Sequence, residues 1–218
     1  MVAYWCHCHT VPARLIQYGR QVSRACCYDS PMEAFLISMG IVALAEMGDK
    51  TQLLALVLAA RFRKPWPIVW GILTATVANH ALAGGLGAWV TIALGPETLR
   101  WVLGASFVAM AVWMLIPDKL DNAETGKAPR FGVFGTTVVA FFLAEMGDKT
   151  QIATVMLVAQ YRAYVWVVLG TTLGMMLANA PVVWFGERVT RLVPIRVVHV
   201  VSALIFAVFG VVALIGWK

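Results

Sequence analysis

Charged residues are scarce in this chain. Only 13% of its 218 residues are Asp, Glu, Lys or Arg, whereas 61% are hydrophobic. A soluble domain carries about 25% charged and about 45–50% apolar residues, so the composition excludes a soluble enzyme, a disordered tail and a nucleic-acid-binding module. The formal net charge of +6 does not favour a nucleic-acid partner either, because the basic residues lie at the edges of apolar stretches, as in membrane proteins. The expected partner of most of the surface is the lipid bilayer.

Cysteine is absent after residue 31, and the only histidines there are His80 and His199. Zn²⁺ and Cu⁺ prefer Cys and His ligands, so this part of the chain does not favour them as substrates. All four cysteines lie within residues 1–31. Such a tail could bind soft metals or target the chain, but we expect 1–31 to be an N-terminal extension that is not part of the fold, with Met32 as an alternative start.

Long apolar stretches account for most of the remaining sequence. A helix needs about 20 apolar residues to cross the hydrocarbon layer of a membrane, and prolines, glycines and basic residues separate six such stretches. We therefore expect an all-α polytopic membrane protein with six transmembrane helices. The predicted spans are 32–60, 66–94, 99–116, 131–159, 163–185 and 195–217.

Basic residues are distributed unequally between the two sides of the predicted bundle. One side holds nine of them and the other holds six, three of which lie in the N-terminal tail. Because cytoplasmic segments carry an excess of Lys and Arg, the central linker is predicted to be cytoplasmic and both termini to lie outside. The nine residues are Arg61, Arg63, Lys64, Lys119, Lys127, Arg130, Arg188, Arg191 and Arg196.

An internal duplication is the most informative feature. The segment LAEMGDKTQ occupies residues 44–52 and recurs unchanged 99 residues later at 143–151, and the same spacing relates Phe107 to Phe206. An odd number of spans in each copy inserts the second copy upside down, and such inverted repeats recur in secondary transporters. The expected organisation is a first three-helix repeat at 32–116, a cytoplasmic linker at 117–130 and a second three-helix repeat at 131–218.

Each copy of the motif places charged residues inside an apolar stretch. A charge at the bilayer centre costs at least about 2.5–3.5 kcal/mol on insertion scales, so such residues usually mark pathways. On a helix, Glu46 and Asp49 share a face, while Gly48 permits a kink or an unwound turn. Oxygen ligands suit hard cations such as Mn²⁺, Ca²⁺ and Mg²⁺. The predicted metal ligands are Glu46, Asp49, Glu145 and Asp148, and the predicted supporting residues are Lys50, Thr51, Gln52, Lys149, Thr150 and Gln151.

Two asparagines occupy matching positions in the second span of each repeat. Asn79 and Asn179 could add carbonyl oxygens to the metal site, or they could form interhelical hydrogen bonds. The sequence favours neither role over the other, so both residues are included among the supporting or transport-coupling residues.

Charge counting indicates how such a site would work. Four acids and two lysines leave the pair of motifs at −2, which one divalent cation neutralises. When the cation leaves, protonation of one or two carboxylates is the cheapest compensation in a low dielectric. Exchange of a cation for protons is therefore the expected activity. The structural alternative is a set of internally paired Glu–Lys and Asp–Lys clusters, which the surplus of carboxylate disfavours.

The doubled motif Glu-x-Gly-Asp-Lys-(Thr/Ser) resembles the signature of the Golgi-type divalent-cation/proton exchanger family, in its short bacterial form. The resemblance covers about residues 32–218. It implies export of Mn²⁺ from the cytoplasm, with Ca²⁺ as a second candidate, in exchange for protons across the bacterial inner membrane. It also implies no enzyme activity and no resident cofactor. By resemblance, Glu46, Asp49, Glu145 and Asp148 bind the cation and exchange protons.

Two other classes of function compete with transport. An intramembrane aspartyl protease would use Asp49 and Asp148 as a dyad, but the lysine directly after each Asp argues against two carboxylates that share a proton. A structural membrane subunit would need the acids only for stability. The sequence does not rank Mn²⁺ against Ca²⁺, and it leaves open whether the protein forms a homodimer.

Overall fold

The computed structural model describes residues 30–115, 131–186 and 195–215. The chain divides into two compact units, Met1–Ser30 and Pro31–Lys218, and every described helix belongs to the second. The predicted linker at 117–130 lies outside the described residues, as does nearly all of the predicted extension at 1–31. Several of the basic residues that predict the orientation lie there too. These boundaries and the orientation stay predictions.

Within the described residues the chain is all-helical, which confirms the expected all-α class. Three of the described helices begin with proline, whose missing N–H is not needed in the first turn. Two others are followed by Arg63 and Arg162, whose φ values of 51° and 52° are left-handed and end the helix. The helices are α1 (Pro31–Glu46), α2 (Lys50–Phe62), α3 (Pro65–Ala93), α4 (Pro96–Met114), α5 (Gly132–Glu145), α6 (Lys149–Tyr161), α7 (Tyr164–Phe185) and α9 (Ile195–Ile215).

Two of the predicted spans, 32–60 and 131–159, are not continuous helices. The first consists of α1 and α2, which are bent by 71° relative to each other, and the second consists of α5 and α6. By length and apolar composition, α3 and α7 can each cross a membrane, and α1 with α2 counts as a third span if the bent pair is one. These helices fit a membrane protein. Six spans and the inverted orientation of the repeats stay predictions.

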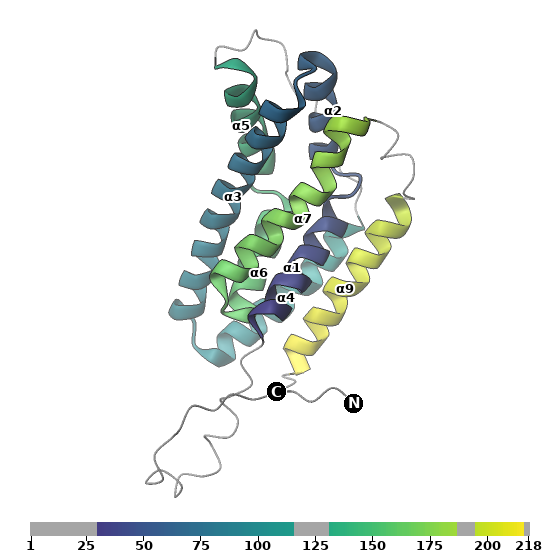
Figure 1. The fold of residues 1–218 in the computed structure, drawn as a ribbon. Coiled ribbons are helices and arrows are strands. Elements are labelled where there is room, and N and C mark those ends of the chain that lie inside the picture. The colour runs from purple at the N-terminus through teal and green to yellow at the C-terminus, as the bar shows by residue number, and fades with distance from the viewer. Residues whose placement is uncertain (1–29, 116–130, 187–194, 216–218) are drawn as a thin grey trace, which may run out of the picture. The chain divides into compact units, whose positions relative to one another are not determined.

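Helices from the two halves of the chain pack against each other. Figure 1 shows α1 alongside α7 and α3 alongside α5, and both pairs are in contact. In the sequence repeat α1 corresponds to α5 and α3 corresponds to α7, so the two contacts are equivalent. The last helices of the two halves, α4 and α9, also pack together. There the repeat-related rings of Phe107 and Phe206 stack with their centroids 6.2 Å apart.

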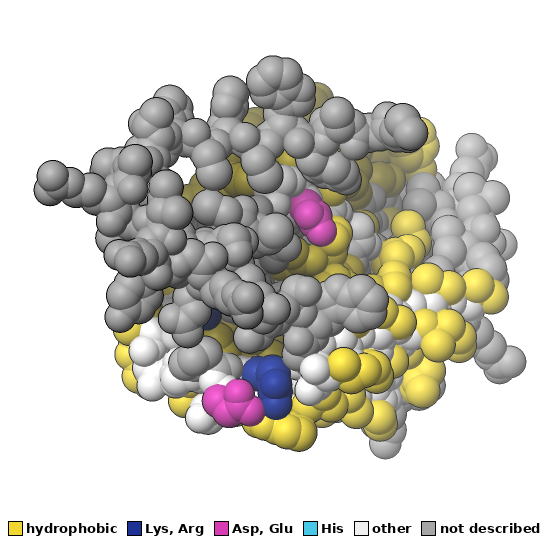
Figure 2. All heavy atoms as spheres, turned by 90° about the horizontal axis from the view of Figure 1, so that it is seen from below, with side chains coloured by type: hydrophobic (Ala, Val, Ile, Leu, Met, Phe, Trp, Pro, Cys, Tyr) yellow, Lys and Arg dark blue, Asp and Glu magenta, His cyan; other side chains and the backbone are white. Residues whose placement is uncertain are grey.

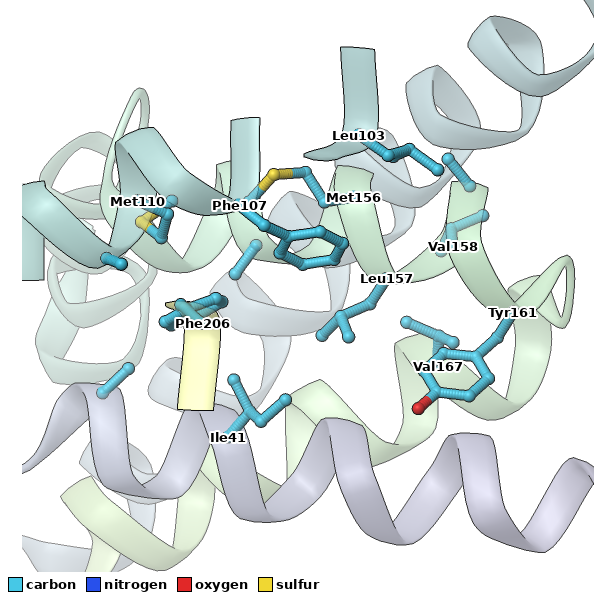
Figure 3. Close-up of a cluster of buried hydrophobic side chains, with 14 of the residues drawn as sticks. Ile41, Leu103, Phe107, Met110, Met156, Leu157, Val158, Tyr161, Val167 and Phe206 are labelled. Atoms are coloured by element: carbon cyan, nitrogen blue, oxygen red, sulfur yellow. The ribbon is translucent and has the colours of Figure 1, made fainter. Parts of the chain in front are cut away.

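Two clusters of buried hydrophobic side chains fill the spaces between these helices. The first joins α1, α4, α6, α7 and α9 around Phe107, Leu157 and Phe206 (Figure 3). The second joins α2, α3, α5 and α7, with Ile72 and Phe141 fully buried. Between membrane helices such packing stabilises through van der Waals contacts rather than through exclusion of water. The two clusters therefore hold together the helices that carry the repeated motif.

The outer surface of the helices is also hydrophobic. Trp66, Leu82, Trp89 and Ile92 are each more than half exposed. Figure 2 shows hydrophobic side chains over much of the described surface in that view, with few charged side chains among them. An apolar surface of this extent is unfavourable in water, whereas lipid solvates it. The surface supports the expectation that the bilayer surrounds these helices.

The first prediction concerns the contact between α1 and α7. A Cβ atom added at Gly174 would lie 2.5 Å from the carbonyl oxygen of Met39 and 2.9 Å from the amide nitrogen of Ala43. Since backbone atoms cannot step aside, Gly174→Ala must push α1 away from α7. We expect it to destabilise the protein by about 1–3 kcal/mol, the usual cost of overpacking, and to lower the Tm of the purified protein in detergent.

Gly85 of α3 provides the matched control for this substitution. Nothing lies within 4 Å of the position of its added Cβ atom. Gly85→Ala therefore replaces a glycine inside a helix without a clash, which stabilises a helix by about 0.5–1 kcal/mol. We expect an unchanged or higher Tm for this variant. Equal Tm values for the two variants would contradict the close contact of α1 with α7.

Candidate metal centre

Both copies of the motif interrupt a helix in the same way. Helix α1 ends at Glu46 and α2 begins at Lys50, and the equivalent break separates α5 from α6. The intervening Gly48 and Gly147 have φ values of 83° and 78°, a conformation that residues with a Cβ atom rarely adopt. The expectation that Glu46 and Asp49 share one face of a continuous helix is therefore wrong. The unwound turn that glycine permits is what forms.

The two glutamines of the motif hold these turns. The amide nitrogen of Gly48 donates to Oε1 of Gln52 at 2.9 Å, and that of Gly147 donates to Oε1 of Gln151 at 2.7 Å. Nε2 of Gln52 also donates to the carbonyl oxygen of Ala178 in α7 at 2.9 Å. The amide oxygens of these two predicted supporting residues are thus engaged with the backbone. In this structure the glutamines position the turns.

The two threonines of the motif contact its glutamates. Oγ1 of Thr51 donates to Oε2 of Glu46 at 2.7 Å, and Oγ1 of Thr150 donates to Oε2 of Glu145 at 3.0 Å. Both glutamates are at most 1% exposed. Each threonine therefore holds one oxygen of a buried carboxylate, and the other oxygen of that carboxylate is not engaged by the threonine.

The four acids of the two motifs meet in one place. Each of Glu46, Asp49, Glu145 and Asp148 offers one oxygen, and these four oxygens lie within 4.8 Å of one another. All four residues are buried. Oε1 of Glu46, Oε1 of Glu145 and Oδ2 of Asp148 have no hydrogen-bond partner among the residues that the structure describes. Since buried polar atoms are almost always paired, these oxygens indicate a ligand or a proton at the centre.

An ion pair links the two motifs. Nζ of Lys50 lies 3.0 Å from Oδ1 of Asp148, so the lysine of one copy contacts the aspartate of the other. The structural alternative to a metal site predicts pairs within each motif, and this pair joins different motifs instead. Lys149 is buried, whereas 36% of the Lys50 side chain is exposed.

The electrostatics of the cluster favour a cation. Four ionised carboxylates at this separation repel one another strongly, because a protein interior screens charge less than water does. Lys50 and Lys149 offset two of the four negative charges. A divalent cation or bound protons can offset the remainder. The centre can therefore hold a hard cation in oxygen ligands, or protons in its place.

The two asparagines lie on the helices that pack against the motif. Nδ2 of Asn79 donates to the carbonyl oxygen of Phe142 in α5 at 3.1 Å, which is an interhelical hydrogen bond. Nδ2 of Asn179 donates within α7, to the carbonyl oxygen of Met175 at 3.2 Å. Oδ1 of each asparagine is buried without a hydrogen-bond partner in the described part of the chain. Asn79 thus fills the interhelical role, and both side chains keep an oxygen available.

A neighbouring residue was not among the predicted site residues. His80 of α3 is 1% exposed, and neither ring nitrogen has a hydrogen-bond partner within the described residues. The signal in the sequence is the presence of a histidine inside an apolar span, where polar residues are expensive. It lacks a counterpart in the second repeat, so the duplication does not point to it.

The sequence matches one family of known proteins. The profile of the family "Divalent cation/proton antiporter GDT1" matches residues 34–122 and 133–218. A Vibrio cholerae protein named "Putative manganese exporter" is 51% identical over 190 residues, which cover 87% of this chain and 94% of that protein. A GDT1-like protein of Synechocystis is 27% identical over 84% of this chain and 97% of its own length. No solved structure matches significantly. These matches confirm the resemblance drawn from the doubled motif.

The second prediction concerns the threonine that contacts Glu46. Thr51→Val removes the hydroxyl that donates to Oε2 and leaves this buried oxygen without that donor. Loss of a partner to a buried group costs about 1–3 kcal/mol, so the Tm in detergent should fall. Thr51→Ser keeps the hydroxyl and should retain most of the stability.

Thr74 of α3 is the control for the same change. Its hydroxyl is exposed and donates to the carbonyl oxygen of Trp70 in its own helix. Thr74→Val should change stability by less than about 0.5 kcal/mol, as exposed substitutions usually do. A Tm for Thr51→Val as high as that for Thr74→Val would mean that the contact with Glu46 does not stabilise the centre.

Proposed function

Because this chain belongs to the GDT1 family of divalent cation/proton antiporters, we propose that it exports Mn²⁺ from the cytoplasm in exchange for protons. The observation that carries the proposal is the carboxylate cluster, in which four buried acids each bring one oxygen within 4.8 Å of the others. The cation is held between the two EMGDKT segments, residues 46–51 and 145–150. Each segment supplies one glutamate and one aspartate.

The depth of the cluster along α3 supports a site near the membrane midplane. Trp66 and Trp89 are exposed near the two ends of this helix, and tryptophan favours the membrane interfaces. At 1.5 Å per residue they are about 35 Å apart, which matches a hydrocarbon layer of about 30 Å with its boundaries. Asn79 lies near the middle of this interval and binds the carbonyl oxygen of Phe142, one turn before Glu145.

Mn²⁺ is the proposed substrate, and Ca²⁺ is the second candidate. Both accept carboxylate oxygens, and the Vibrio cholerae relative is named as a manganese exporter. Mg²⁺ suits the centre less, because it gives up its water ligands reluctantly and the four acids are almost completely buried. The direction of transport, out of the cytoplasm, also follows the name of that relative.

Protons replace the cation during the return of the empty carrier. Without a metal the motifs carry a formal charge of −2, and moving that charge through a low-dielectric bundle is costly. Protonation of Glu46 and Glu145 removes it. Each of these carboxyl groups keeps one oxygen that has no partner among the described residues, and that oxygen can carry the proton. Glutamate is also protonated more readily than aspartate.

Alternating access would come from the two repeats. We infer six spans arranged as two inverted three-helix units in the bacterial inner membrane, with the 117–130 linker in the cytoplasm and both termini outside. Rocking of one unit against the other would expose the shared centre to each side in turn. The equivalent contacts of α1 with α7 and of α3 with α5 are the surfaces along which the units would move.

The protease alternative is not favoured. A catalytic aspartyl dyad needs two carboxylates that share one proton. The ammonium group of Lys50 lies 3.0 Å from Oδ1 of Asp148, so this oxygen is paired with a cation and not with a second carboxylate. The structural-subunit alternative requires that the acids contribute to stability alone, which the transport measurements below would reveal.

The third prediction concerns the acids. Glu46→Gln and Asp148→Asn each remove a negative ligand with little change in size, so both variants should insert into the membrane. Removing a residue that only hydrogen-bonds a metal ligand lowers metal affinity or activity about 10–100-fold. Removing a ligand itself should lower Mn²⁺ flux into proteoliposomes by more than this. Glu97→Gln is the control, because Glu97 is 75% exposed, pairs with Arg100 and is not a member of the cluster. Normal flux in Glu46→Gln or Asp148→Asn would contradict the site.

The fourth prediction concerns coupling. In proteoliposomes a proton gradient should accelerate Mn²⁺ movement in the opposite direction, and dissipation of the gradient by a protonophore should abolish this acceleration. Parallel measurements with Ca²⁺ and Mg²⁺ rank the substrates, with Mg²⁺ expected to be slowest. Flux that is indifferent to the gradient would refute exchange. If the protein cleaves a membrane reporter and this cleavage persists after metal chelation, the protease is favoured. If substitutions of the acids change stability but not flux, a structural subunit is favoured.

A further inference from the structure

The two motif copies differ in the exposure of their lysines, although their sequences are identical. Asp49 and Asp148 have nearly the same backbone angles, with φ and ψ of −79° and 167° in the first and −82° and 168° in the second. Lys149 is buried, whereas Lys50 is partly exposed, with 36% of its side chain accessible. Local sequence cannot cause this difference. It reflects the different surroundings of the two lysines, and the side of the cluster next to Lys50 is the more exposed one.

The exposed part of the Lys50 side chain must face water. Lys50 immediately follows the turn that brings Asp49 into the cluster, so it lies at the depth of the centre. A charged side chain exposed to hydrocarbon at this depth would be strongly unfavourable, and intramembrane charges almost always face the bundle interior or a water-filled cavity. The exposed part of Lys50 therefore faces water, while its ammonium group reaches Oδ1 of Asp148.

Lys50 thus competes with an entering cation for the carboxylate of Asp148. Its ammonium group neutralises a carboxylate that belongs to the cluster of possible metal ligands. A lysine is a compact charge on a flexible four-carbon stem, so the ammonium group can leave Asp148 and move into water without movement of the backbone. A divalent ion at the centre would repel it in that direction. Lys149 is buried and has no comparable exposed route.

We propose that Lys50 is a tethered counter-cation, which neutralises Asp148 when the centre holds no divalent ion and is displaced toward water when one binds. The proposal rests on cation binding by the four acids, as proposed above. It adds a competitor built into the chain. The competing ammonium group lowers the affinity of the centre for metal. It also limits the negative charge of the centre after one cation has left and before the next one binds. Both effects assist release of the cation, which an exporter requires as much as binding.

Residue-specific acylation of the wild-type protein tests the displacement directly. The protein in nanodiscs is treated with an amine-acetylating reagent, with and without saturating MnCl₂, and the rate at each lysine is measured by mass spectrometry. We expect Mn²⁺ to raise the rate at Lys50 at least about threefold, because the freed amine leaves its ion pair. Lys64 is exposed outside the centre and serves as the reference, and buried Lys149 should react slowly in both conditions.

Calorimetric titration of the same sample with MnCl₂ separates the two proposals. If Mn²⁺ binds and the rate at Lys50 stays constant or falls, the counter-cation role is refuted while the metal centre stands. If Mn²⁺ does not bind at all, both proposals fail. If Mn²⁺ binds and the rates at Lys50 and Lys64 rise together, the change is general and the specific displacement is also refuted.

Substitutions at Lys50 give an independent test with opposite signs. Lys50→Gln removes the competitor and should lower the Kd for Mn²⁺ about tenfold. Lys50→Arg installs a charge that holds carboxylates with two parallel hydrogen bonds, and it should raise the Kd. An ion pair that only supports the fold predicts weaker binding in both variants. Weaker binding by a Lys50→Gln protein that keeps its Tm would overturn the proposal, and if this variant does not fold, Lys50→Arg and the acylation rates decide.

Discussion

Mutual repulsion of four buried carboxylates is the constraint around which this centre is arranged. Thr51 and Thr150 each direct a hydroxyl to one glutamate, and Lys50 directs its ammonium group to Asp148. These contacts satisfy some carboxylate oxygens and leave others without a partner among the described residues. A centre that is satisfied only in part could bind a cation, as the proposed function requires. Complete internal pairing would leave no carboxylate oxygen for a substrate.

The chain assembles this centre by using one local design twice. Glycine at a positive φ ends a helix directly after each glutamate, and a glutamine side chain closes each turn. The helices then approach closely where a glycine removes the side chain, as at Gly174 against α1 and at Gly71 against Thr137 of α5. The broken helices place the carboxylates inside the bundle, and the glycine contacts bring the helices of the two halves close together. Both features depend on small residues within otherwise apolar helices.

The chemistry of the centre could be predicted because acids in an apolar stretch are visible in the sequence itself. The duplication draws attention to Glu46, Asp49, Glu145 and Asp148, and the resemblance of the doubled motif to a known signature indicates the family. The break after Glu46 could not be derived from hydropathy, because 32–60 is apolar outside the motif apart from Glu33 and Ser38. The bend of 71° depends on how α2 packs. The Lys50–Asp148 ion pair could not be predicted from the sequence either. It requires the relative position of two segments that are 99 residues apart.

Duplication also bears on how such a centre could have two states. An exchanger needs two conformations of similar free energy, since a large difference would trap the carrier on one side. If the two copies are inverted relative to each other, as proposed, exchanging their local conformations would exchange the open side without new kinds of contact. The unequal exposure of Lys50 and Lys149 is the kind of asymmetry that one such state would have. In the opposite state Lys149 would be the lysine in contact with water, and the same four acids would face the other side of the membrane.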